Sequence, residues 1–298
     1  MDAPGGSSEA AGTVEVPGDA QPGLLVGYDG SVAAGAAIGA GALLLPGRHA
    51  TVVHLWTPPF ASEHLRRRLW AEVRNPDAFS AAVEREGLRE AERIAGMGVA
   101  LARAAGWPAE PLVARCFGDE GLQLARLTRE TGSDVLLLGS RGLGGAQALL
   151  GSASDTAVHH ADRPVLVVPY PLLSDDAAAL PAGPVLVGWD DSSGSRRALD
   201  AARRLWPGRE VLLGVVDQDA DAAPVPADAP SATVLRLDSD APGSATAVAA
   251  ALAAGARAHG AAVVAVGSRG RSALREVVLG SVAMGTLHRA HRPVLVVP

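Results

Sequence analysis

The sequence predicts an α/β protein made of two tandem units, each a parallel sheet with helices on both faces. Three observations support this prediction. A set of three motifs occurs twice in the same order, short apolar runs alternate with longer Ala/Leu/Arg-rich stretches, and 298 residues suffice for two domains of about 150 residues each. Apolar runs without polar alternation, such as Val135–Leu138, indicate strands that are buried on both faces.

The repeat consists of three paired segments. Residues 24–31 (LLVGYDGS) return as 185–192 (VLVGWDDS), residues 134–142 (DVLLLGSRG) return as 262–270 (AVVAVGSRG), and residues 163–169 (RPVLVVP) return as 292–298. This order indicates a tandem duplication. We therefore divide the chain into a tail at 1–21 with a disordered composition, a first domain at 22–170, a linker at 171–183 and a second domain at 184–298.

In the first unit, strand and helix signals alternate along the chain. We expect strands at Leu24–Tyr28, Thr51–Trp56, Pro111–Arg115, Val135–Gly139 and Val165–Val168, and helices at Val32–Leu45, Ser62–Gly106, Glu120–Thr131 and Ser152–His160.

The second unit is shorter than the first. Asp29 and Gly139 lie 110 positions apart, whereas the corresponding Asp190 and Gly267 lie 77 apart. The stretch Asp217–Thr233 is rich in Pro, Asp and Ala where the first unit has its long helix, so we expect the second unit to lack its second helix.

Composition excludes several classes of function. All 26 positive side chains are arginine, so lysine-dependent phosphate binding and Schiff-base chemistry are excluded. A compositional bias is the simplest cause of the missing lysine. The formal net charge of −6 disfavours nucleic-acid or anionic-membrane partners. Cys116 is the single cysteine, and neither a signal-peptide pattern nor an apolar run of roughly 20 residues is present, which indicates a reduced, cytoplasmic protein.

Two glycine-rich loops are the candidate ligand-binding segments. Glycines let the backbone approach an anion, and the free N–H groups and serine hydroxyl at a helix start bind negative oxygens. A strand end that also carries Asp29 or Asp190 lies where open α/β sheets bind ligands. Each feature also has a simpler explanation as a tight turn or a helix cap. The loops comprise Gly139, Ser140, Arg141, Gly142, Gly151 and Ser152 in the first unit, and Gly267, Ser268, Arg269, Gly270, Gly280 and Ser281 in the second.

These motifs resemble those of the universal stress protein family over residues 23–298. The resemblance rests on the start motif Val26–Ser31, the Gly-x-x-Gly loop followed by Gly-Ser, and the closing Pro-Val-Leu-Val-Val strand, all present in both units. It implies five-stranded sheets of order 3-2-1-4-5 and stress-linked regulation without established turnover. It also implies ATP as the ligand, with ADP and AMP as alternatives and Mg²⁺ present only alongside the nucleotide.

The resemblance also implies roles for individual residues. The strand-1 motif, at the adenine and ribose end, is Gly27, Asp29 and Ser31 or Gly188, Asp190 and Ser192. The residue packing on adenine is Leu55 or Val215, the glycine loops hold the phosphates, and Ser154 adds a hydroxyl that Ala283 lacks.

The two units depart from the family pattern in different ways. The spacing from Gly270 to Gly280 has the expected nine residues, whereas Gly142 to Gly151 has eight, and only the second unit places a cation, Arg271, after the second glycine. The first unit keeps the hydroxyls and the full set of helices. We favour the second unit slightly and leave the choice open.

Proline ends both closing strands, Val165–Val168 and Val294–Val297, as is typical of sheet edges. The resemblance implies that these edges pair antiparallel, so we expect an internal pseudo-dimer; a homodimer of whole chains is left open.

The favoured function is an ATP-binding regulatory protein. A protein-interaction module with degenerate sites is the alternative, and a slow ATPase ranks last because no general base can be named. We expect neither a catalytic residue nor a metal site, since the eight histidines lack metal-ligand spacing.

Overall fold

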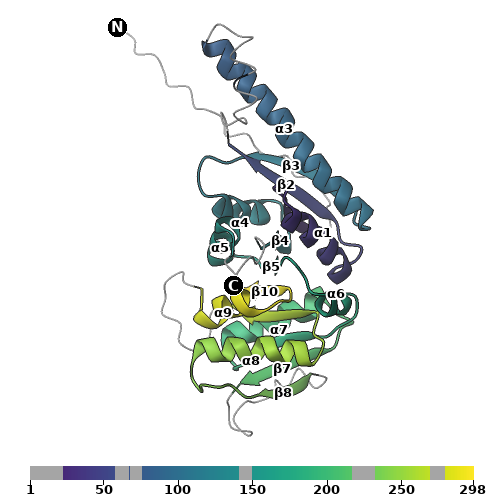
Figure 1. Ribbon diagram of the computed structural model, residues 1–298, viewed down its shortest axis with the longest axis vertical. Helices are drawn as coiled ribbons and strands as arrows, with labels where there is room; N and C mark the ends of the chain where they lie inside the picture. Colours follow the sequence, from purple (N-terminus) through teal and green to yellow (C-terminus); the bar gives the residue numbers. More distant parts are fainter. Residues whose placement is uncertain (1–22, 58–66, 68–75, 141–149, 217–231, 269–278) are drawn as a thin grey trace, which may run out of the picture.

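The computed structural model describes residues 23–57, 67, 76–140, 150–216, 232–268 and 279–298. Ten strands form one sheet in the order β3-β2-β1-β4-β5-β10-β9-β6-β7-β8 (Figure 1). The strands are β1 Leu24–Gly27, β2 Ala50–Trp56, β3 Ala109–Arg115, β4 Val135–Gly139, β5 Val165–Val168, β6 Val185–Gly188, β7 Val211–Val216, β8 Thr233–Leu237, β9 Val263–Gly267 and β10 Val294–Val297. The helices are α1 Val32–Leu44, α3 Pro76–Ala104, α4 Glu120–Glu130, α5 Ser152–His160, α6 Ser174–Ala179, α7 Ser193–Leu205, α8 Ala245–Ala258 and α9 Ser281–Arg289.

The order 3-2-1-4-5 is confirmed in the first unit, and β8-β7-β6-β9-β10 repeats it in the second. All predicted strands of the first unit are present, with ends shifted by at most two residues. The predicted long helix is present as α3, but most of residues 62–75 lie outside the described residues. The same holds for residues 1–21 and for most of Asp217–Thr233, the segment predicted to lack a helix.

Helices cover both faces of the sheet, as the continuous apolar strands predicted. One core packs α1, the end of α3 and α7 against side chains such as Leu24 and Val187. The other packs α4, α5, α8 and α9 against side chains such as Leu25 and Leu186. Neighbouring residues of one strand therefore belong to opposite cores.

The two closing strands join the units. Strands β5 and β10 pair antiparallel, with Val294 opposite Val167 and Val296 opposite Val165. The expected antiparallel pairing of the two closing edges is confirmed, and it makes one sheet that continues through both units.

The segment predicted as the linker contains a short helix. Residues 174–179 form α6, and Leu180 just beyond it is 1% exposed. Asp176 of α6 forms an ion pair with Arg292, Oδ1 to Nη2 2.9 Å, in which the two side chains are 3% and 4% exposed. Burial lowers the pKa of the Arg292 guanidinium, while nearby Asp176 acts in the opposite direction. The division of the chain that makes 171–183 the linker stays a prediction, and α6 within this segment packs against the second unit.

A second connection runs from α7 to the end of α1. The indole Nε1 of Trp206 donates to Leu44 O at 2.8 Å, and the Arg209 guanidinium donates to Leu180 O at 2.7 Å and Gly183 O at 3.1 Å. Burial lowers the pKa of Arg209. The Arg209 side chain thus donates hydrogen bonds to carbonyl groups of the linker, close to the first unit.

We expect Arg209→Ala to lower the free energy of unfolding by about 1–3 kcal/mol, because it leaves partly buried carbonyl oxygens without donors. Arg209→Lys should not restore stability, since an ammonium cannot reproduce the planar fork of donors. Urea unfolding followed by circular dichroism measures both effects. Arg204→Ala, which removes an exposed arginine near the end of α7, is the control and should stay within about 0.5 kcal/mol of the wild type.

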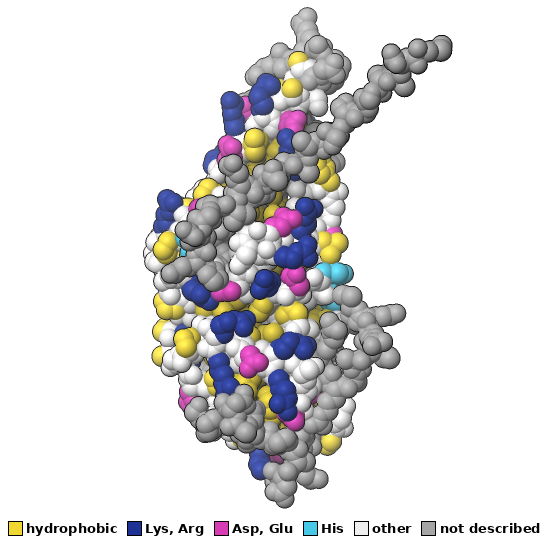
Figure 2. All heavy atoms as spheres, turned by 180° about the vertical axis from the view of Figure 1, so that it is seen from behind, with side chains coloured by type: hydrophobic (Ala, Val, Ile, Leu, Met, Phe, Trp, Pro, Cys, Tyr) yellow, Lys and Arg dark blue, Asp and Glu magenta, His cyan; other side chains and the backbone are white. Residues whose placement is uncertain are grey.

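The surface carries mixed charge on the face seen in Figure 2. Positive side chains, all of them arginine, lie among aspartate and glutamate side chains over both halves of that face.

Candidate functional site

Each unit has a cavity at the carboxyl ends of its central strands. The first cavity has a volume of about 100 Å³ and the second about 440 Å³. The first cavity is lined by Gly27, Tyr28, Asp29, Ser31, Ala33, Ala34, Val53, His54, Leu55, Glu120, Leu124, Leu138, Gly139, Gly151, Ala153 and Ser154. The second is lined by Gly188, Trp189, Asp190, Ser192, Ser195, Gly214, Gly243, Ala245, Val216, Val248, Leu252, Val266, Gly267, Gly280, Ser281, Val282 and Ala283.

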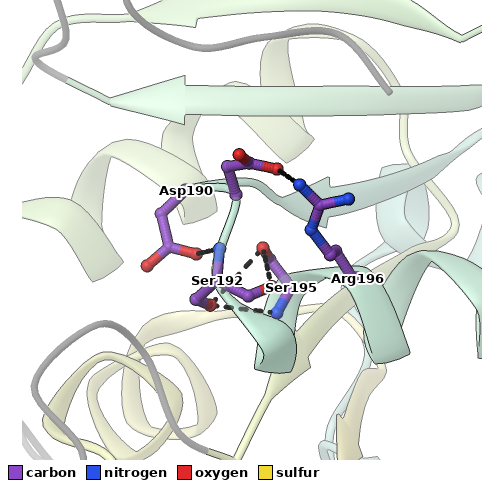
Figure 3. Close-up of polar contacts among 5 residues, drawn as sticks. Asp190, Ser192, Ser195 and Arg196 are labelled. Atoms are coloured by element: carbon purple, nitrogen blue, oxygen red, sulfur yellow. Dashed lines mark hydrogen bonds and ion pairs between the residues drawn. The ribbon is translucent and has the colours of Figure 1, made fainter. Parts of the chain in front are cut away.

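The Asp-x-Ser motifs both shape the backbone and line the cavities. Asp29 Oδ1 accepts from Ser31 N at 2.9 Å, and Ser31 Oγ in turn caps α1 by accepting from Ala34 N. In the second unit Asp190 Oδ1 accepts from Ser192 N at 3.1 Å, and Ser192 Oγ caps α7 (Figure 3). The helix-starting role suggested by the sequence is therefore present, and the same residues face the cavities.

Asp191 replaces the glycine that stands at position 30 in the first unit. Both residues adopt left-handed backbone, with φ of 61° at Asp191 and 83° at Gly30, a conformation that aspartate tolerates better than most side chains. The Asp191 carboxylate is paired with Arg196. The Arg196 guanidinium lies 5.9 Å from the centroid of the Trp189 ring. The extra negative charge is thus balanced within the same turn.

The first glycine of each loop is required by helix packing. A Cβ on Gly139 would lie 2.6 Å from Ala33 O, and a Cβ on Gly267 would lie 2.5 Å from Gly194 C. The start of α1 or α7 therefore rests directly on the end of β4 or β9. This contact brings the N-terminus of the helix to the rim of the cavity.

The serine next to that glycine, Ser140 or Ser268, is not among the residues that line the two cavities, and its role in binding phosphate stays a prediction. Ser140 Oγ accepts from Tyr170 N at 3.3 Å and so supports the chain where it leaves β5. Ser268 bonds through its backbone, its N to Val297 O and its O to Gly280 N, both at 2.6 Å. Both serines stand one position beyond the strand-ending glycine that lines the cavity.

The Gly-Ser pairs open α5 and α9 as predicted, with one correction. The N-cap residues are Gly151 and Gly280, so Ser152 and Ser281 stand at the first helical position instead of the cap. Because glycine has no side chain, neither helix start has a side-chain capping hydrogen bond. Ser281 lines the second cavity, whereas Ser152 is not among the residues lining the first. The first-turn N–H groups of α9 thus border the cavity without a capping side chain.

Ser154 and one of the two residues predicted to pack on adenine line a cavity, and the other does not. Ser154 lines the first cavity, but its Oγ donates to Gly139 O at 3.1 Å. Leu55 lines the first cavity as predicted. Val215 belongs to the opposite core, and Val216 occupies its place, because Gly27 pairs with Val53 while Gly188 pairs with Gly214. Val53 and Gly214 are therefore equivalent, and so are the residues two positions after them, Leu55 and Val216.

The remaining predicted residues, Arg141, Gly142, Arg269, Gly270 and Arg271, lie outside the described residues.

Sequence reasoning missed the walls supplied by strands β2 and β7 and by helices α4, α7 and α8. These walls include Val53, His54 and Glu120 in the first unit, and Gly214, Val248 and Ser195 in the second. His54 Nδ1 lies 2.9 Å from Tyr28 O, and burial, aided by the Asp29 charge, raises the pKa of the Tyr28 phenol. Side chains alternate along a strand, so the residues of β2 and β7 that pair with Gly27 and Gly188 could have been expected to line the cavities.

No helix among the described residues combines the length and the apolar character of a membrane span. The same residues contain no cluster of three or more His, Cys, Asp or Glu side chains suited to a metal ion.

Comparison with known proteins agrees with the repeated motifs. The family model described as "Universal stress protein family" matches residues 23–169 and 245–298. Universal stress proteins of Mycobacterium tuberculosis and Mycobacterium bovis are 30% identical to this chain, over 93% of its length and 97% of theirs.

Solved structures agree on the fold. A universal stress protein from Archaeoglobus fulgidus superposes with a TM-score of 0.66 at 21% identity, covering 92% of this chain and 97% of the other. A putative universal stress protein from Pseudomonas aeruginosa gives 0.52 at 14% identity, covering 92% of each chain. The family match and the mycobacterial relatives, together with the doubled motifs, establish that the chain belongs to the universal stress protein family.

Proposed function

We propose that this protein binds an adenine nucleotide, ATP in the first instance, and acts as a regulatory protein without efficient turnover. The observation that carries the proposal is the second cavity, where the first turn of α9, from Gly280 to Ala283, borders a space of about 440 Å³ next to Asp190. This volume is within the range of about 300–1,000 Å³ that is typical of small-molecule sites.

The two ends of the cavity suit different parts of a nucleotide. Free N–H groups at the start of a helix, with the positive end of its dipole, favour phosphate oxygens. Val216, Val248 and Leu252 supply an apolar wall on which a base can pack, and the Asp190 carboxylate lies where it can accept hydrogen bonds from a ribose. Adenine is the base implied by the family resemblance.

We further propose that Mg²⁺ enters only with the phosphates, and that the protein works in the cytoplasm with Cys116 as a free, buried thiol. We also propose that the units act as an internal pseudo-dimer. The antiparallel pairing of β5 with β10 supports this arrangement.

Isothermal titration calorimetry of the whole chain tests nucleotide binding. ATP, ADP and AMP are titrated with and without Mg²⁺, and adenosine is the control that lacks phosphate. We expect dissociation constants below about 1 mM for the nucleotides, and weaker binding of adenosine because it leaves the α9 N–H groups unused. Absence of binding up to millimolar ATP would contradict the proposal and favour a ligand-free interaction module. Steady release of phosphate or pyrophosphate would contradict the non-catalytic role.

A further inference from the structure

We infer that the second cavity alone holds the nucleotide and that the first repels it, an inference that rests on the proposed function. The repeat places equivalent side chains around both cavities, so each difference between them can be assigned to a particular substitution. Three independent differences favour the second cavity.

The first difference is space. Along the strands, Val53, Leu55 and Leu138 of the first cavity are replaced by Gly214, Val216 and Val266 in the second. Each replacement is smaller, which accounts for a second cavity about four times as large as the first. At about 100 Å³ the first cavity is below the range of small-molecule sites.

The second difference is the charge on the wall. Glu120, in the first turn of α4, lines the first cavity together with Asp29. Counting back from strands β4 and β9, the equivalent residue in α8 is Val248, which lines the second cavity. Among the described residues, two carboxylates thus line the first cavity and one, that of Asp190, lines the second. Neighbouring carboxylates disfavour the approach of a triphosphate.

The third difference is at the helix that would receive the phosphates. The first turn of α5 contains Asp155, whereas the first turn of α9 contains no acidic residue, and Met284 stands at the equivalent position. A carboxylate there offsets part of the positive end of the α5 dipole, whereas the first turn of α9 carries no such charge. Space, wall charge and helix dipole therefore all favour the second cavity.

Matched substitutions in the two units test this inference. Ser281→Asp and Ser152→Asp each place a carboxylate at the first helical position of α9 or α5, where negative charge is compatible with the helix. In calorimetry the wild type should bind one ATP per chain. Ser281→Asp should weaken ATP binding at least about tenfold through like-charge repulsion, and Ser152→Asp should leave it unchanged. Ser281→Asn controls for the change in size.

A second pair of variants tests the wall charge. Val248→Glu copies Glu120 into the second cavity and should weaken ATP binding about tenfold, whereas the neutral Val248→Gln should have a clearly smaller effect. Equal effects of Glu and Gln would overturn the electrostatic argument. Two ATP per wild-type chain, or loss of binding in Ser152→Asp, would overturn the assignment to the second cavity while leaving the proposed function intact. No ATP binding by the wild type would instead refute the proposed function itself.

Discussion

Replacing Asp176 by alanine is expected to lower the free energy of unfolding by about 3–5 kcal/mol, because the variant leaves a buried guanidinium without its counter-ion. Arg292 is 4% exposed, and its Nη2 lies 2.9 Å from Asp176 Oδ1. The same guanidinium also donates to Ala261 O and cannot turn towards water without breaking that bond. The linker and the start of β10 should therefore loosen together. Urea unfolding followed by circular dichroism and tryptophan fluorescence measures the loss.

Two comparisons separate the buried charge from simple loss of packing. The double variant Asp176→Leu/Arg292→Met removes both charges and should lose less stability than Asp176→Ala alone, since apolar residues often replace a buried ion pair at little cost. Glu130→Ala breaks the exposed Arg126–Glu130 pair and should cost about 0.5 kcal/mol or less. If Asp176→Ala were as mild as Glu130→Ala, the pair would not hold the linker in place.

The repeat made most of the fold predictable from the sequence. Strands such as β4 and β5 are short apolar runs bounded by Gly, Pro or charged residues, so their ends were predicted to the residue. The family resemblance supplied the strand order. The linker helix could not be predicted, because α6 has only six residues and depends on one buried pair that forms across more than a hundred positions of sequence.

The same motif also acquires different roles in the two units. Arg163 and Arg292 occupy equivalent places before Pro-Val-Leu-Val-Val, yet Arg163 is exposed whereas Arg292 is buried against α6. Only the packing of the linker distinguishes them. The candidate site was predictable to the same extent: Asp29, Asp190, Gly151 and Gly280 line the cavities, whereas strand register places Val215 in the opposite core.

The second large effect concerns Gly267, where a side chain has no room. Gly267→Ala should lower the free energy of unfolding by about 3 kcal/mol, the upper end of the usual range for overpacking, because the added Cβ meets backbone atoms of Gly194 at 2.5–2.7 Å. Backbone at the start of α7 cannot rotate away as a side chain would, so α7 must shift from β9. Thermal or urea unfolding measures the loss.

The matched control for Gly267→Ala is Gly39→Ala. A Cβ at Gly39, within α1, meets no atom within 4 Å, so this change should stabilise the protein by up to about 1 kcal/mol through helix propensity. A Gly267→Ala variant as stable as the wild type would show that α7 does not rest on β9. Because Gly267 also lines the second cavity, its substitution should impair ATP binding by displacing α7. Loss of binding in Gly267→Ala would thus report on the fold, whereas Ser281→Asp, at a position that tolerates a carboxylate, reports on the phosphate site.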